Sequence, residues 1–118
     1  MKLIIAGGRD FNNGQLLIST LVDLVNKGNI PECPELVCGM ARGADMLAYR
    51  LWADNNMVVH QFVPDWNGLG KRAGFVRNTE MAEFADALVA FWDGKSKGTK
   101  HMIDTMKWAG KPVYEVRY

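Results

Sequence analysis

The sequence has few residues of the kinds that build disulfide, metal and membrane proteins. Its 118 residues include two cysteines, two histidines and four prolines. Two thiols cannot form a disulfide framework, so we expect a reducing, cytoplasmic environment. Cys33 and Cys38 have no second ligand pair at zinc spacing, and we expect no metal site and no resident cofactor. The apolar run within residues 1–7 is too short for a signal peptide or a membrane span, so no membrane contact is expected.

The sequence also lacks a strong charge of either sign. Its formal net charge is +1 at pH 7, so no global field attracts nucleic acid or a membrane surface, and any basic site must be local. With 118 residues, of which 48% are hydrophobic, the chain has enough material for one core and little for a second lobe. We therefore expect a single domain over residues 1–118.

Hydrophobic patterns of two kinds alternate along the chain. Short, nearly continuous apolar runs predict strands, and apolar residues at helical spacing predict helices between them. The expected strands are 2–6, 35–38, 57–63, 87–92 and 112–116, and the expected helices are 13–27, 44–55, 75–85 and 98–109. We expect Asn12 to cap the first helix, with Gln15 in a capping-box position and Gly28 as the stop.

This alternation predicts an α/β fold. Strands separated by helices, with no hairpin signal between them, imply right-handed crossovers and a parallel sheet covered on both faces. The continuous apolar character of the strands agrees, because a doubly covered sheet needs no polar alternation. We predict a Rossmann-like three-layer sandwich with a five-stranded parallel sheet. In chain numbering, the predicted strand order is 3-2-1-4-5.

Glycines and charged residues gather where the predicted strands end. Four segments follow the first four strands: 7–10, 39–45, 65–78 and 93–100. In an open parallel sheet, ligands bind outside the carboxyl ends of the strands. Glycines there let backbone amides approach a ligand, and the N-termini of the helices that follow favour an anion. The sequence therefore predicts an anion-binding site at this edge.

The charges of these four segments support the same prediction. They contain eight of the 14 basic residues and four acidic residues, whereas the rest of the chain has six basic and nine acidic residues. The basic residues are Arg9, Arg42, Lys71, Arg72, Arg77, Lys95, Lys97 and Lys100, and the acidic residues are Asp10, Asp45, Asp65 and Asp93. A nearly neutral chain thus concentrates positive charge at one edge of the predicted sheet.

Four motifs in these segments carry a resemblance to a known family. They are Gly7-Gly8-Arg9-Asp10-Phe11, Gly39-x-Ala41-Arg42-Gly43-Ala44-Asp45-x-Leu47-Ala48, Lys71-x-Ala73-Gly74-x-x-Arg77-Asn78-x-x-Met81 and Ala90-Phe91-Trp92-Asp93-Gly94-x-Ser96-x-Gly98-Thr99. Together, in this order, they resemble the SLOG superfamily. Within it, the sequence looks most like the small branch of uncharacterised bacterial and phage proteins formerly grouped as a domain of unknown function. The resemblance spans essentially the whole chain.

The resemblance implies a Rossmann-like fold that binds nucleotides or nucleotide-derived ligands. The superfamily includes cytokinin-activating phosphoribohydrolases, DNA-processing protein A and sensor domains of antiviral systems. Matching by motif, the positions expected to line the ligand pocket are Gly7, Gly8, Gly39, Arg42, Gly43, Gly94, Ser96, Gly98 and Thr99. The phosphoribohydrolases carry a catalytic glutamate three residues after the threonine of their Gly-Thr motif. Here that position is Met102, which argues against N-glycosidic hydrolysis by their mechanism.

Each further candidate residue also has an ordinary structural explanation. The remaining candidates for ligand contact are Arg9, Asp10, Asp45, Arg77, Asn78 and Trp92. Arginines often form surface salt bridges, but Arg42 between glycines at a helix entry favours a phosphate contact. Asp45 either complements the positive end of its helix or contacts a ribose hydroxyl. Asn78 is either a helix N-cap or a site residue, and the adjacent arginine favours the site.

Aromatic, histidine and serine residues give weaker signals. Trp66 and Trp92 stand at strand ends, where packing under the long connection is the commoner role and base stacking is the alternative. His60 is expected to be structural, and His101 is a candidate acid or base near the edge. The segment Gly94-Lys95-Ser96-Lys97-Gly98 matches a nucleophile elbow, but no suitably spaced acid and histidine follow it. We therefore expect the Ser96 hydroxyl to donate a hydrogen bond to a phosphate.

Three functions are compatible with this sequence. The leading hypothesis is a binding or sensor protein for a small, phosphate-bearing nucleotide or nucleotide-derived ligand. The first alternative is cleavage or transfer of an N-glycosidic bond in nucleoside monophosphates, with Asp10, Asp45 or Asp93 replacing the glutamate. The second is binding of single-stranded nucleic acid, as in DNA-processing protein A, which the weak net charge disfavours. Apolar outer residues on the third and fourth predicted helices permit a homodimer.

Overall fold

Strands and helices alternate along the chain in the computed structural model, which describes residues 1–118. The strands are β1 (Lys2–Gly7), β2 (Glu35–Cys38), β3 (Val59–Gln61), β4 (Ala87–Trp92) and β5 (Val113–Arg117). The helices are α1 (Gly14–Asn26), α2 (Ala44–Asp54), α3 (Trp66–Leu69), α4 (Ala73–Phe84) and α5 (Lys97–Trp108), with a 3₁₀ turn at Gly70–Arg72. The α/β class predicted from the hydrophobic pattern is confirmed.

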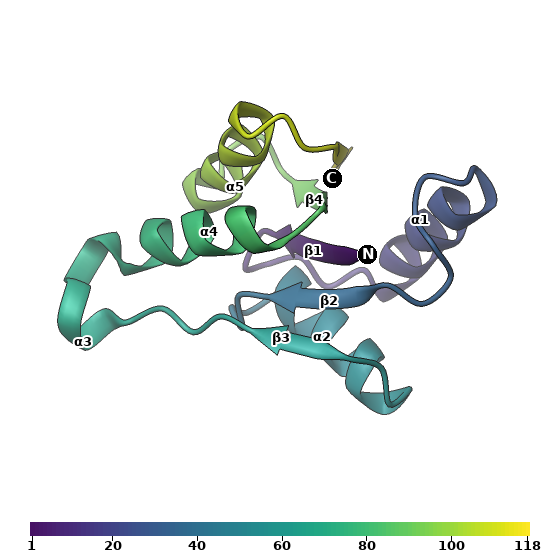
Figure 1. The fold of residues 1–118 in the computed structure, drawn as a ribbon, viewed down its shortest axis with the longest axis horizontal. Coiled ribbons are helices and arrows are strands. Elements are labelled where there is room, and N and C mark those ends of the chain that lie inside the picture. Colours follow the sequence, from purple (N-terminus) through teal and green to yellow (C-terminus); the bar gives the residue numbers. More distant parts are fainter.

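The five strands form one parallel sheet in the order β3-β2-β1-β4-β5 (Figure 1). This is the order predicted from the crossover rule. β1 lies in the centre and pairs with β2 on one side, from Lys2 opposite Glu35, and with β4 on the other, from Leu3 opposite Ala87. The chain reverses its direction of travel across the sheet between β1 and β4, which is the usual ligand position in such folds.

Helices cover both faces of the sheet, which makes a three-layer sandwich. Alternate residues of β1 point to opposite faces: Leu3 and Ile5 belong to one buried cluster, and Ile4 belongs to the other. The first cluster contains the buried face of α1 and α2, and the second contains Met81 of α4 and Met102 of α5. The Rossmann-like sandwich is therefore confirmed.

One local prediction was wrong at a helix start, and one open alternative was decided. The α1 helix is capped by Asn13, not Asn12, because the Asn13 side-chain oxygen accepts the Leu16 amide at 3.0 Å. Asn78 is no N-cap, because α4 begins at Ala73 and Asn78 lies in the helix interior. The segment 65–78 is also more ordered than a loop, since Asp65 accepts the Gly68 amide at 2.9 Å and starts α3.

The edge strand β3 is shorter than predicted. The pattern predicted 57–63, but only Val59–Gln61 pairs in the sheet. Its neighbour β2 has only four residues and ends at Cys38, so the pairing of β3 with β2 ends at Gln61, opposite Cys38. Val63, beyond that point, is 69% exposed.

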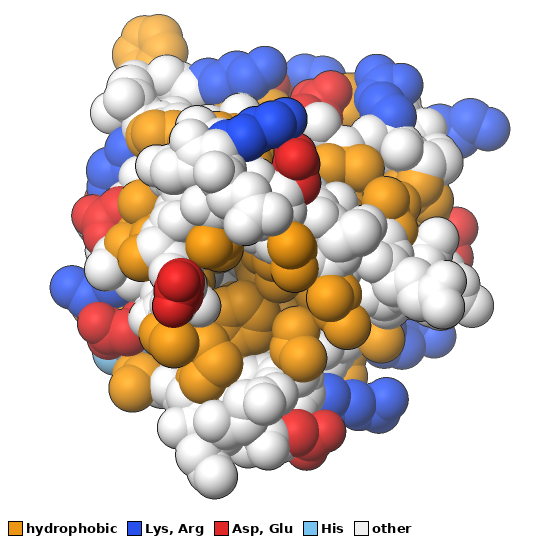
Figure 2. All heavy atoms as spheres, turned by 90° about the vertical axis from the view of Figure 1, so that its right-hand side faces the viewer, with side chains coloured by type: hydrophobic (Ala, Val, Ile, Leu, Met, Phe, Trp, Pro, Cys, Tyr) orange, Lys and Arg blue, Asp and Glu red, His pale blue; other side chains and the backbone are white.

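Two surfaces outside the sheet edge are apolar. Figure 2 shows a hollow among hydrophobic side chains on the side of the molecule near α1; α1, the 30–34 segment and the end of α2 line a groove there of about 380 Å³. On the opposite layer, Trp108 of α5 is 93% exposed and Phe84 of α4 is 36% exposed. The homodimer suggested for those helices stays a prediction. No helix is both long enough and apolar enough to cross a membrane.

Replacement of Gly43 by alanine should destabilise the protein by about 2 kcal/mol or more. Gly43 has a φ of +81°, and a Cβ there would collide with the Gly8 carbonyl oxygen. Gly14→Ala is the matched control, because nothing lies within 4 Å of its added Cβ and its φ is ordinary. Urea unfolding measures both variants. Equal stability of the two would contradict the close approach of the loops.

Candidate anion-binding site

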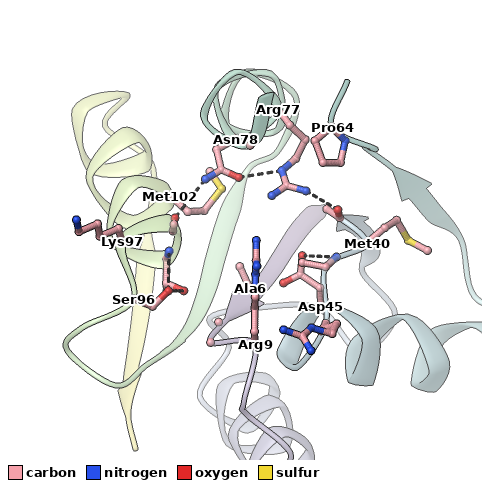
Figure 3. Close-up of a pocket in the computed structure, with 18 of the residues that line it drawn as sticks. Ala6, Arg9, Met40, Asp45, Pro64, Arg77, Asn78, Ser96, Lys97 and Met102 are labelled. Atoms are coloured by element: carbon pink, nitrogen blue, oxygen red, sulfur yellow. Dashed lines mark hydrogen bonds between the residues drawn. The ribbon is translucent and has the colours of Figure 1, made fainter. Parts of the chain in front are cut away.

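A cavity of about 880 Å³ opens at the carboxyl ends of the strands. Its floor contains Ala6 to Asp10 at the end of β1, and its walls come from the β2–α2 loop, α4 and the start of α5 (Figure 3). Because β1 lies beside both β2 and β4, the cavity stands at the point where the strand order reverses.

Twelve of the fifteen candidate ligand-binding residues line this one cavity. They are Gly7, Gly8, Arg9, Asp10, Gly39, Arg42, Asp45, Arg77, Asn78, Ser96, Gly98 and Thr99. They come from four segments that are far apart in sequence, and the parallel sheet brings these segments to one edge. Five basic and three acidic side chains line the cavity. Arg72, Lys95 and Lys100 of the basic set and Asp65 of the acidic set lie outside its lining.

The other three candidates, Gly43, Trp92 and Gly94, do not line the cavity. Gly43 packs its backbone against Gly8. The Trp92 indole nitrogen donates to the Ser96 carbonyl at 3.0 Å, and the Arg117 guanidinium covers its ring at 4.6 Å. Gly94 takes a φ of +85° in the turn after β4. These three residues therefore make contacts within the loops and do not face the cavity. Trp66, in contrast, lines the cavity.

Arg77 connects two walls of the cavity. Its Nη1 donates to the Gly39 carbonyl, and its Nε donates to the Asn78 side-chain oxygen at 3.0 Å. Gly39 has no room for a side chain, because a Cβ there would lie 2.6 Å from Arg77 Nη1 and 2.9 Å from an Asp45 oxygen. The glycine of the second motif is therefore explained by the close approach of an arginine and a carboxylate.

Three arginines face the cavity without an ion-pair partner. The four ion pairs of the molecule are Lys27–Asp23, His60–Glu35, Lys100–Asp104 and Arg117–Glu115, and none involves Arg9, Arg42 or Arg77. Figure 3 shows Arg9 and Arg77 entering from opposite sides. Burial lowers the pKa of Arg77, and the positive charge of Arg9 lowers it further against the opposing pull of Asp45. An anion between the two guanidinium groups would relieve this repulsion.

Asp45 is the most deeply buried acid of the site, with 5% of its surface exposed. Burial raises its pKa from 3.8 to about 6, although the charge of Arg77 and the amides of Ala41, Asp45 and Gly7 pull it downward. The Ala41 amide donates to it across 3.4 Å. The carboxylate is therefore poorly compensated for its burial, and a ligand donor would find an acceptor here.

In the β4–α5 loop, some of the backbone amides that could bind an anion already donate to protein acceptors. Asp93 accepts the amides of Lys95 at 2.8 Å and Ser96 at 2.9 Å, and these hydrogen bonds lower its pKa. The Ser96 hydroxyl accepts the Thr99 amide at 3.4 Å and caps α5. The amides of Lys97 and Gly98 in the first turn of α5 donate to no protein acceptor. They remain available to an anion at the N-terminus of that helix.

The sequence did not reveal the apolar part of the lining. Met40, Val63, Pro64, Phe75, Met81 and Met102 also border the cavity. Met40 has a φ of +60°, which no local signal predicts for a methionine. Met81 ends the third motif and follows Arg77 by one helical turn, which places both residues on the same side of α4. His101 does not line the cavity, and no cluster of three or more His, Cys, Asp or Glu side chains has metal-binding geometry.

Comparison with known proteins gives two matches. The model of the YspA, cpYpsA-related SLOG family matches residues 1–68. The Gene 61 protein of Mycobacterium phage D29 is 34% identical over 119 residues, which cover 95% of this chain and 93% of the phage protein. No solved structure matches. The matched region holds the first two glycine motifs of the cavity.

Asp45→Asn should stabilise the protein above pH 7 and change little near pH 4. Because the folded state binds the Asp45 proton more tightly than the unfolded chain, this residue's contribution to stability is full below about pH 4 and is lost as the pH rises through about 6. The asparagine does not ionise, so the difference in unfolding free energy should grow with pH to the order of 3 kcal/mol. Urea unfolding from pH 4 to 8 measures it. If the unfolding free energies of the unmodified chain and of Asp45→Asn changed in parallel with pH, the burial of a charged Asp45 would be contradicted.

Proposed function

Because the chain belongs to the YspA, cpYpsA-related SLOG family, we propose that its cavity binds a phosphate-bearing, nucleotide-derived ligand. The observation that carries this proposal is the set of three arginines that face the cavity without an ion-pair partner. Guanidinium groups in this state match the geometry and charge of phosphate oxygens. The free amides of Lys97 and Gly98 supply further donors at a helix N-terminus.

The size and polarity of the cavity suit a nucleotide. At about 880 Å³ it has room for more than a phosphate ion, in the range typical of small-molecule sites. The phosphate contacts lie on the Arg9 and Arg77 side, and Asp45 supplies an acceptor for a sugar hydroxyl or a base amine. Trp66, 52% exposed at the mouth, offers an aromatic surface to a base.

The residue at the family's catalytic position favours binding over turnover. Met102 stands where the related phosphoribohydrolases carry glutamate, and it is 1% exposed in the core beneath the cavity. A thioether provides no proton and no nucleophilic oxygen for cleavage of an N-glycosidic bond. We therefore propose a binding or sensor protein as the leading function.

Arg9→Ala should weaken nucleotide binding about tenfold, because one charge-assisted contact is lost. Arg9 is exposed and makes no side-chain hydrogen bond within the protein, so its loss should not lower stability. AMP, ADP, ATP, ADP-ribose and cyclic nucleotides are screened by thermal shift, and the tightest is measured by calorimetry.

Arg50→Ala is the matched control for this experiment. Arg50 is an exposed arginine on α2 that does not line the cavity. It should bind the selected nucleotide as the unmodified chain does. Equal loss of affinity in both variants, or no stabilisation by any nucleotide, would refute the proposal. Length-dependent binding of a single-stranded oligonucleotide, lost in Arg9→Ala, would instead assign the cavity to nucleic acid.

Asp45 supports a second candidate, cleavage of an N-glycosidic bond. A carboxyl group that titrates near pH 6 can donate a proton to a leaving base at neutral pH. This activity predicts release of free base from nucleoside monophosphates. It should disappear in Asp45→Asn while nucleotide binding remains. Chromatography of the reaction mixture measures the base, and turnover that persists in Asp45→Asn would remove Asp45 from this role.

A further inference from the structure

His101 lies behind the cavity and is joined to Arg77 through Asn78. Arg77 Nε and the Asn78 side-chain oxygen are 3.0 Å apart, and Asn78 Nδ2 lies 3.2 Å from both the Gly98 carbonyl and His101 Nδ1. Asn78 is 6% exposed. The three side chains therefore form a connection, buried at Asn78, from α5 through α4 to the cavity.

Two neighbours fix the orientation of the Asn78 amide. Arg77 Nε can only donate, so it requires the amide oxygen, and the Gly98 carbonyl can only accept, so it requires the amide nitrogen. The remaining proton of Asn78 Nδ2 then points to His101 Nδ1, which must accept it. His101 is therefore neutral and carries its proton on Nε2, toward the Thr105 hydroxyl at 3.5 Å.

Resting on the proposed function, we propose that neutral His101 is a positioning residue for anion binding: it holds Asn78, and through Asn78 it holds Arg77 in the orientation that faces the ligand. Protonation of His101 Nδ1 would place its N–H donor opposite the N–H donor of Asn78 Nδ2, and the hydrogen bond between them would be lost. Rotation of the Asn78 amide would not restore the network, because it would turn the amide nitrogen toward Arg77 and the amide oxygen toward Gly98.

The surroundings of the ring favour its neutral form. Asn78 and Phe75 of α4 contact it, with the Phe75 ring centroid 4.6 Å away. On α5, Asp104 is the charged group that acts on the ring, and Asp104 is itself paired with Lys100 at 2.6 Å. Burial lowers the pKa of His101 despite Asp104. The connection should therefore be intact at neutral pH and should break only below the ordinary titration range of a histidine.

The decisive test uses ¹⁵N NMR of the ligand-free full chain. At pH 8, His101 should show an unprotonated Nδ1 and a protonated Nε2. On acidification, the Asn78 amide and the Arg77 Nε–H signals should shift with the midpoint of the His101 ring. His60→Asn is the control, because His60 pairs with Glu35 and contacts α4 only at its last residue, Phe84, so it should leave this titration unchanged. A protonated Nδ1 at pH 8, or Arg77 signals that ignore the His101 titration, would overturn the proposal.

Two variants of His101 test the effect on binding, with inorganic pyrophosphate as the probe at pH 8. His101→Leu removes the acceptor and should weaken pyrophosphate binding about threefold to tenfold. His101→Asn restores an acceptor near the Nδ1 position and should bind as the unmodified chain does, with no titration of the Asn78 signals. Equal losses in both variants would overturn the positioning role. If neither pyrophosphate nor any nucleotide of the screen binds the unmodified chain, the proposed function is wrong, and the NMR measurement still decides the connection.

Discussion

The hydrogen bond from Arg77 to the Gly39 carbonyl is the contact on which the cavity depends. It joins α4, from the second half of the chain, to the loop after β2, from the first half. The two halves also meet through the pairing of β1 with β4 and through the two buried clusters. Because the Arg77 guanidinium lies close against Gly39, this residue must remain without a side chain.

The charges around this contact are arranged at a cost to stability. Asp45 is buried with weak compensation, and Arg9 and Arg77 repel each other across the cavity. Folding alone gives no reason for this arrangement, because an apolar floor would satisfy the same packing. Poorly compensated charge in a concave site is typical of ligand binding, where the missing partners come from the bound molecule.

The sequence predicts the fold well because its signals are local and strong. The continuous apolar runs of β1 and β4 require cover on both faces, and the helices between strands require parallel crossovers. Convergence of the glycine motifs then follows from topology. Side-chain direction does not follow: Trp92 and Arg77 both looked like site residues, yet the Trp92 ring is covered by Arg117. The positive φ of Met40 and the connection through Asn78 depend on tertiary contacts, which a single sequence does not record.

The segment from Trp66 to Arg72 has a different relation to the rest of the molecule. None of its residues is buried, yet Trp66 and Lys71 border the cavity. Substitutions or insertions in this stretch would therefore leave the packing of the core unchanged. A change in this segment would alter the mouth of the cavity and leave its floor at the end of β1 in place.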